Sequence, residues 1–144
     1  MTERPEGSSG PLDIPTLTVL AQRAATHPLV SNWQFRPDSI TPRVLELQVD
    51  SEQYPTAIHD VRVDIRWFEG GDYSVHYLEI SADETWQCRW DRHPKPNTPT
   101  GHFHPPPTAE DTVEPSPLDA DHHLDVLFAV LDWIGERVQE LYDV

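Results

Sequence analysis

The sequence contains almost no lysine. Lys95 stands alone against nine arginines and 25 aspartates and glutamates, and the formal net charge of the 144 residues is -15. An acidic surface with so little lysine is typical of a halophilic archaeal protein, whose high-salt cytosol favours strongly hydrated surfaces. An acidic protein of a low-salt cytosol is the alternative. At molar salt the Debye length falls to about 3 Å, so the acidic charge does not exclude an RNA target.

Cysteine and long apolar runs are also scarce. Cys88 is the one cysteine, which excludes an internal disulfide bond. It alternates with Trp86 and Trp90, so we expect a small buried side chain. No stretch reaches the ~18 apolar residues of a membrane-spanning helix, and the first residues lack the apolar segment of a secretory signal. We therefore expect a cytoplasmic protein that does not span a membrane.

The chain is most simply one domain of the α+β class. Residues 1–12 are rich in Pro, Gly and Ser and are predicted to be a disordered tail, which leaves a domain at 13–144. A short strand is expected at 30–35. Apolar and polar residues alternate, as in half-buried strands, over residues 43–50, 60–68, 73–81 and 84–91.

Helical spacing of apolar residues predicts a helix at each end of this domain. Asp13 can cap the first helix, with Pro15 in its first turn and Pro28 beyond its end. Ser116 followed by Pro117 predicts the start of a closing helix over residues 117–142. The prediction is an antiparallel four- or five-stranded meander with both helices flanking it and the C-terminal one packed on the sheet. The predicted core comprises Val63, Ile65, Trp67, Trp86, Trp90, Leu127, Leu131 and Ile134.

A Pro/His-rich loop is predicted at residues 92–117. Residues 94–117 hold eight of the 15 prolines, so no regular element is expected there. The loop coincides with the one cationic cluster of the chain. Acid/base-capable side chains gathered on irregular backbone indicate a functional site.

The residue types of this region suit acid/base chemistry on RNA. Metal-free cleavage needs a base for the 2′-OH, an acid for the leaving oxygen and cations for the phosphorane charge. The candidate catalytic residues are Arg89, Asp91, His93, His102 and His104, with His76 and Tyr77 as second choices. Candidate substrate-binding residues are Arg92, Lys95, Arg62 and Arg66. Asp91 shares a strand face with Arg89, so we expect it to hold Arg89 or a loop histidine. A solvated polar loop beside an Arg89–Asp91 pair is the alternative.

Metal binding is a second chemical alternative. His102 and His104 are two residues apart, which on extended backbone places both rings on one side. His93 would be a third ligand and Asp91 a fourth, and a zinc ion with an open position would activate water. Because no cysteine pair accompanies this weak motif, no cofactor is expected and zinc is kept only as the alternative.

Three motifs occur in a recognisable order. His27-Pro28-Leu29-Val30 follows the first helix, and Tyr73-Ser74-Val75-His76-Tyr77 lies in a predicted strand. Arg89-Trp90-Asp91 then precedes the Pro/His-rich loop, which contains His102-Phe103-His104. Over about residues 15–115 this combination resembles the TumE-type toxins of prokaryotic toxin–antitoxin pairs.

The sequence departs from that family pattern at two places. Arg92-His93 stands where the family has Asn-Ala, and His93 alone stands where the family has two adjacent histidines. The later cluster is His102-Phe103-His104 rather than three near-consecutive histidines.

The resemblance implies a toxin whose partner is a small cognate antitoxin protein. RNA and a second copy of the chain are further candidate partners. Two other functions stay open: a non-catalytic module that binds protein or nucleic acid through the His-rich loop, and a metal-dependent hydrolase.

Overall fold

The computed structural model describes residues 10–93, 101–110 and 112–143. Its elements are α1 (Ile14–Ala24), β1 (Val30–Arg36), β2 (Val44–Val49), the short 3-10 helix η1 (Ser51–Gln53), β3 (Ile58–Trp67), β4 (Tyr73–Ser81), β5 (Thr85–Arg92), β6 (Gly101–His104), β7 (Glu114–Pro115) and α2 (His123–Tyr142). The predicted α+β class and the two flanking helices are confirmed. The predicted number of strands is wrong, because these described residues form a sheet of seven strands rather than four or five.

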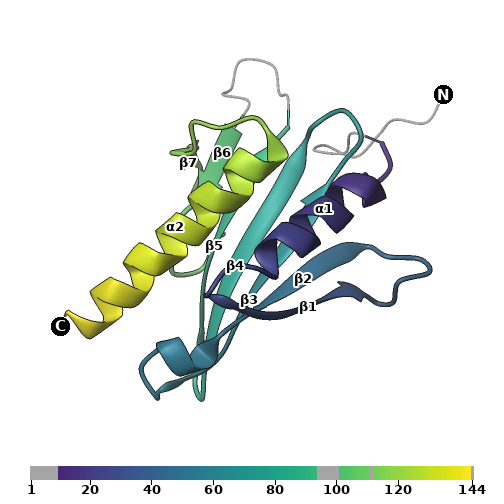
Figure 1. Cartoon of the computed structure of the whole chain (residues 1–144). Helices are drawn as coiled ribbons and strands as arrows, with labels where there is room; N and C mark the ends of the chain where they lie inside the picture. The colour runs from purple at the N-terminus through teal and green to yellow at the C-terminus, as the bar shows by residue number, and fades with distance from the viewer. Residues whose placement is uncertain (1–9, 94–100, 111, 144) are drawn as a thin grey trace.

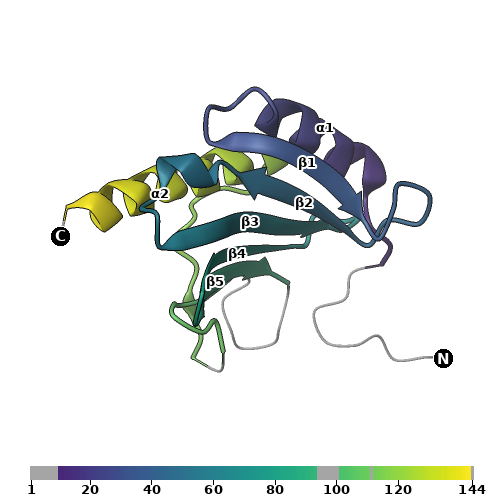
Figure 2. The same ribbon diagram turned by 90° about the horizontal axis from the view of Figure 1, so that it is seen from below.

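The sheet is an antiparallel meander in which every strand pairs with its sequence neighbours. Both helices lie across the same face of this sheet (Figures 1 and 2). We call the opposite side the open face. The register places on it the polar side chains of Glu46, Gln48, Arg62, Asp64, Arg66, His76, Arg89 and Asp91.

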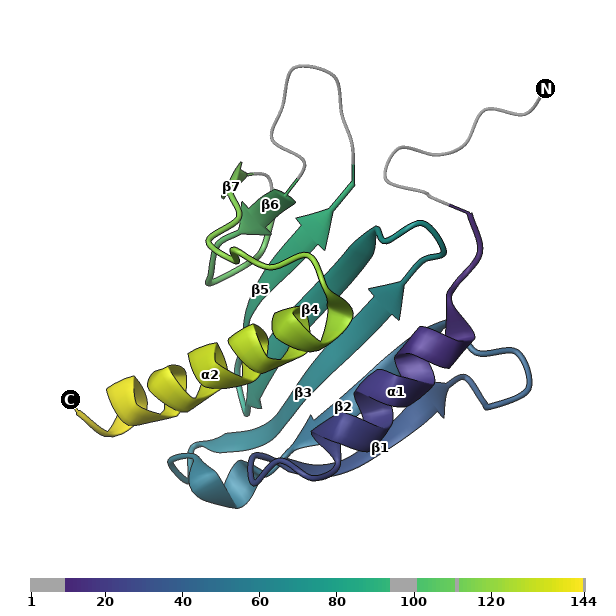
Figure 3. The same ribbon diagram turned by 45° about the horizontal axis from the view of Figure 1, so that its top comes forward.

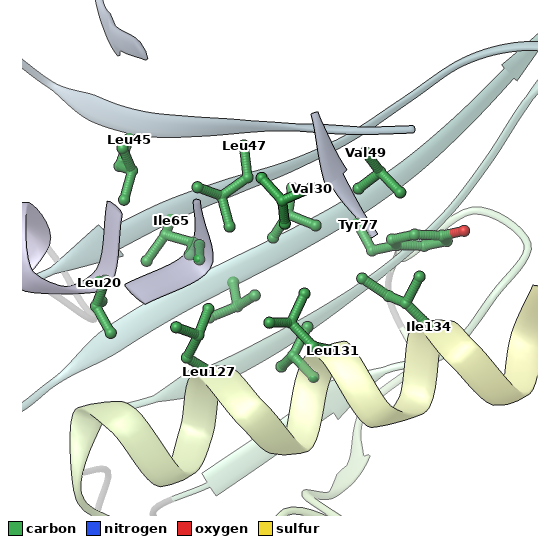
Figure 4. Packing of buried hydrophobic residues seen from close by; sticks show 14 of the residues in the cluster. Leu20, Val30, Leu45, Leu47, Val49, Ile65, Tyr77, Leu127, Leu131 and Ile134 are labelled. Carbon is green, nitrogen blue, oxygen red and sulfur yellow. The ribbon is translucent and has the colours of Figure 1, made fainter. Parts of the chain in front are cut away.

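The core lies between the helices and the sheet. Leu127, Leu131 and Ile134 point from α2 toward the strands (Figure 4) and are at most 3% exposed. Of the predicted core residues, all but Trp86 are at most 4% exposed. Trp86 is only half-buried because it lies toward the edge of α2, where its ring stacks on Trp133 at 6.2 Å between centroids.

The two glycines of the β3–β4 hairpin adopt a conformation that favours glycine. Gly70 and Gly71 have φ angles of 101° and 99°, in the left-handed region that L side chains rarely adopt. Phe68 donates its backbone N–H to the carbonyl of Asp72 at 2.9 Å and closes the turn. These residues therefore form the tight turn that joins β3 to β4.

The absence of regular structure predicted for residues 94–117 is wrong for β6 and β7. Residues 101–104 contain no proline, so each residue can donate to a neighbouring strand. β6 pairs Arg89 with His104 and Asp91 with His102. Phe103, between the two histidines, packs toward the helices at 5.5 Å from Trp90 between ring centroids. The two histidines therefore lie on the open-face side, in a strand rather than a loop.

The closing helix begins at His123, six residues after the predicted start. The Ser116 hydroxyl does accept the backbone N–H of Leu118, at 3.2 Å, but this closes a local turn. Leu118 and Ala120 then pack against the core in non-helical conformation as the chain returns from β7 toward α2 (Figure 3). The cap of α2 is His122, whose Nδ1 accepts the backbone N–H of Leu124.

The predicted disordered tail falls mostly outside the described residues. Within the described part, Leu12 forms an isolated bridge with Phe68, and Pro11 accepts the backbone N–H of Glu69 at 2.9 Å. Asp13 caps α1 as predicted, because its carboxylate accepts the backbone N–H of Thr16.

Candidate active site

A pocket of about 320 Å³ opens on the ends of β3, β4 and β5. We call it the histidine pocket. Its lining comprises Arg66, Phe68, Tyr73, Ser74, His76, Arg89, Asp91 and His93. Two histidines, two arginines and one aspartate thus share one concave surface, which is the composition expected of an acid/base site for an anion.

The strand register brings these side chains together. His76 pairs with Arg89, and Ser74 pairs with Asp91 across β4 and β5. Because directly opposite residues of an antiparallel pair point to the same face, all four lie on the open face. Side chains alternate between the two faces along each strand. A shift of the pairing register by one residue would therefore turn these side chains toward the core.

Arg89, Asp91 and His104 form a compact polar triad. The Arg89 Nε donates to Asp91 Oδ2 at 2.8 Å. The His104 Nε2 lies 3.1 Å from that same carboxylate oxygen and 3.1 Å from the second guanidinium nitrogen of Arg89. Asp91 therefore contacts both the arginine and a histidine of β6, as their shared strand face suggested.

The other ring nitrogen of His104 fixes how this triad can be protonated. Nδ1 donates to the backbone carbonyl of Glu110 at 3.0 Å, because a carbonyl can only accept. A neutral His104 then has its lone pair on Nε2 and accepts from Arg89. A protonated His104 donates from Nε2 to Asp91 instead. His104 is not among the residues that line the pocket, and it contacts two residues that do, Arg89 and Asp91.

His76 is the histidine best suited to act as a base. Its Nε2 donates to the amide oxygen of Gln87 at 2.7 Å, which leaves the lone pair of the neutral ring on Nδ1. Burial lowers the pKa of His76 below its ordinary value of 6.5, against the opposing effects of the Gln87 hydrogen bond and the Asp64 charge. The ring is therefore neutral and proton-accepting at neutral pH.

His93 and His102 lie next to each other, but only His93 lines the pocket. Their ring centroids are 5.1 Å apart with the planes tilted by 32°. His93 lines the pocket, and its buried Nδ1 has no hydrogen-bond partner among the described residues. His102 is only 5% exposed, pairs with Asp91 along the strands and is not among the residues that line the pocket.

Two predicted site residues lie on the opposite face. Tyr77 is fully buried under α2, where its hydroxyl donates to Glu79 at 2.6 Å, and burial raises its pKa. Arg92 is on the helix side, where it binds Asp121 at 2.7 Å beside a separate pocket of about 390 Å³. Neither side chain can reach the histidine pocket.

The remaining predicted binding residues divide into three cases. Arg66 lines the histidine pocket. Arg62 is on the open face but pairs with Asp64 at 3.3 Å, beside a smaller pocket of about 140 Å³. Lys95 lies outside the described residues.

Three residues that line the pocket, Phe68, Tyr73 and Ser74, were not among the predicted site residues. Phe68 follows Arg66 by two residues, so the strand alternation of β3 already placed both on one face. Ser74 was visible in the same way, two residues before His76.

The described residues give no support to a metal centre. No three His, Cys, Asp or Glu side chains within residues 10–93, 101–110 and 112–143 are arranged as metal ligands. The zinc alternative therefore has no ligand set in that part of the chain. No helix in it is long and apolar enough to cross a membrane.

Comparison with protein families identifies the chain. The family model described as Toxin TumE matches residues 18–138, which cover the sheet, most of both helices and every residue of the histidine pocket. No curated protein and no solved structure matches. A toxin of this kind is one component of a toxin–antitoxin system and implies a cognate antitoxin as its partner. The match spans well over half of the sequence, so this chain belongs to the TumE toxin family.

Proposed function

We propose that this toxin acts on RNA and cleaves its backbone in the histidine pocket without a metal ion. The observation that supports this proposal is the gathering of His76, His93, Arg66, Arg89 and Asp91 in one pocket. A pair of histidines supplies a base and an acid, and a pair of arginines supplies charge for a phosphoryl group.

The proposed reaction is an internal transesterification. His76 Nδ1 takes the proton of a 2′-OH, whose oxygen forms a bond to the adjacent phosphorus. The bond from phosphorus to the 5′-oxygen breaks, and His93 donates a proton to that leaving oxygen. The products are a 2′,3′-cyclic phosphate and a 5′-OH, and proton exchange with water restores both histidines.

The arginines have separate tasks in this proposal. Arg66 is exposed and binds the phosphate from the edge of the pocket. Arg89 is held by Asp91 at 2.8 Å, so its guanidinium is oriented before the substrate arrives. His104 is a positioning residue, since its contacts are to Arg89 and Asp91 rather than to the pocket.

The test compares pocket histidines with a histidine elsewhere. His76→Gln and His93→Gln are each expected to lower RNA cleavage by about 10²–10⁴-fold, the usual cost of losing an acid or base group. Both should also relieve growth arrest in cells that express the toxin without its antitoxin. His122→Ala is the control, because that residue caps α2 on the other side of the sheet.

Folding of each variant is checked by circular dichroism and thermal melting. Wild-type cleavage and wild-type toxicity in both folded pocket variants would contradict the proposed chemistry. A protein- or nucleic-acid-binding role without catalysis would then take its place.

A further inference from the structure

Phe68 is one of two aromatic residues that line the histidine pocket, and the other, Tyr73, is buried with its ring stacked on Trp67. Phe68 is half-buried, directly after the end of β3, and shares the open face with Arg66. It is absent from the apolar cluster that fills the space under the helices. A ring held by the fold at the wall of a charged pocket suits a flat, apolar surface of a ligand.

Arg66 is the one open-face arginine of the described residues with no carboxylate partner. Arg36 pairs with Glu46 at 3.6 Å, Arg62 with Asp64 at 3.3 Å and Arg89 with Asp91 at 2.8 Å. Arg66 makes no such ion pair within the described part of the chain and is exposed. Its charge is therefore the most available to a phosphate, and it lines the same pocket as Phe68.

The charge of the whole chain argues against a long electrostatic contact. A duplex is bound mainly by many lysine and arginine contacts to its phosphates. This chain has a net charge of -15, and acidic side chains neutralise Arg36, Arg62 and Arg89 on the open face. Affinity must then come from something other than a row of phosphate contacts. Base stacking on an aromatic ring supplies it and does not weaken with salt as ionic contacts do.

We propose that Phe68 and Arg66 together bind one unpaired nucleotide, with the base stacked on Phe68 and its phosphate on Arg66. The substrate class is then single-stranded or looped RNA, and not a duplex, whose bases are stacked on each other. This inference rests on the proposed function only in taking RNA as the ligand, and it does not depend on cleavage.

The probe is a short single-stranded RNA in which 2′-O-methyl groups replace the 2′-hydroxyls. This RNA binds but lacks the nucleophile, so affinity is measured without cleavage, by fluorescence anisotropy. Phe68→Leu is expected to weaken binding by about 10- to 100-fold, the usual effect of losing one stacked base, whereas Phe68→Trp should retain it. Phe128→Leu is the matched control, because that half-buried phenylalanine lies on α2, on the other side of the sheet.

An abasic nucleotide gives a second test that does not depend on a variant's folding. Removing one base at the bound position should weaken wild-type binding about as much as Phe68→Leu does. On that abasic RNA, Phe68→Leu should cause no further loss, because the stacked pair is already broken. A hairpin duplex of the same sequence should bind the wild type more weakly than the single strand.

The salt dependence of the RNA-binding constant measures how many phosphates the protein neutralises. One or two neutralised phosphates predict a slope of log K against log salt between roughly -0.7 and -1.4 for a single strand. Unchanged binding by Phe68→Leu, equal affinity for the duplex, or a slope steeper than roughly -3.5 would each overturn the inference. So would a Phe68-dependent contact to the antitoxin with no RNA binding at all.

The two proposals fail separately. If the 2′-O-methyl RNA binds through Phe68 but unmodified RNA is not cut, the proposed binding of a nucleotide is supported and the proposed cleavage is contradicted. If wild type and Phe68→Leu cut unmodified RNA at the same rate under substrate-limited conditions, the proposed cleavage is supported and the proposed role of Phe68 in binding is contradicted.

Discussion

At the scale of single residues, hydrogen bonds give the histidines different roles. His76 donates from Nε2 to Gln87 and keeps its lone pair on Nδ1. His104 donates from Nδ1 to a backbone carbonyl and keeps Nε2 between Arg89 and Asp91. In the proposed reaction, one residue type thus supplies a base in the pocket and a support for the arginine behind it.

The burial of His76 predicts how stability depends on pH. Its folded pKa lies below the ordinary 6.5, so in the window below 6.5 the unfolded chain binds a proton that the folded chain does not. The free energy of unfolding should therefore fall as pH falls through that window. His76→Gln keeps a partner for Gln87 and should reduce this slope.

Urea unfolding measured from about pH 7.5 to about pH 5 checks this. Part of the slope should remain, because burial also lowers the pKa of His123. Identical slopes in wild type and His76→Gln would show that His76 is not the buried group described.

The alternation of side chains between the two faces of a strand explains which site residues could be predicted. Arg89 and Asp91 were placed correctly on one face because two residues separate them along β5. Tyr77 and Arg92 were grouped with them by closeness in sequence, although adjacent residues of a strand point to opposite faces. The pocket itself depends on how three strand ends and a hairpin meet, which no local pattern specifies.

At the scale of elements, the four alternating strands were predictable because a half-buried strand has a period of two. Their predicted bounds differ from those of β2, β3, β4 and β5 by at most two residues. β6 was missed because four residues among prolines are too short for that pattern. The start of α2 was missed because a Ser-Pro signal describes a turn as well as a helix cap.

A buried ion pair between Arg137 and Glu79 links α2 to β4 of the sheet. Arg137 makes two hydrogen bonds to the carboxylate of Glu79, at 2.7 and 2.8 Å, and its guanidinium lies 3.6 Å from the ring centre of Trp86. Glu79 is 3% exposed and also accepts the hydroxyl of Tyr77. The whole group lies under the C-terminal half of α2, away from the histidine pocket.

Breaking this pair from one side should be strongly destabilising. Arg137→Met leaves the Glu79 carboxylate buried without its charge partner, at a cost of about 3–5 kcal/mol in the free energy of unfolding. Adding Glu79→Leu should recover much of that loss, because the uncompensated charge is then gone. Urea unfolding of the single and double variants measures both steps.

Arg23→Met is the matched control, since Arg23 is exposed on α1 and contacts only the Phe128 ring among aromatic side chains of the described residues. Its loss should change stability by well under the Arg137 effect. A double variant as unstable as the two single losses added together would contradict the coupling.

At the scale of the whole molecule, the two-layer fold separates the hydrophobic core from the proposed site. The helices bury one face of the sheet (Figure 2), and the open face carries paired charges and the histidine pocket. The net charge is -15, so acidic side chains repel one another in dilute buffer, and salt screens that repulsion.

We therefore expect the Tm to rise by several degrees when KCl is raised from about 0.1 M to about 2 M, where the Debye length is a few ångströms or less. Glycerol at matched viscosity is the control for non-ionic effects. A Tm that is unchanged or lower at high KCl would argue against adaptation of this acidic surface to salt.

The most direct measurement is the end-group chemistry of RNA cut by the purified toxin in EDTA. Mass spectrometry should find 2′,3′-cyclic phosphate and 5′-OH ends, formed by wild type and by His122→Ala. Both folded variants His76→Gln and His93→Gln should form them about 10²–10⁴-fold more slowly. Absence of cleavage, loss of activity in EDTA, 3′-OH ends, or undiminished cleavage by both pocket variants would contradict acid/base catalysis in the histidine pocket.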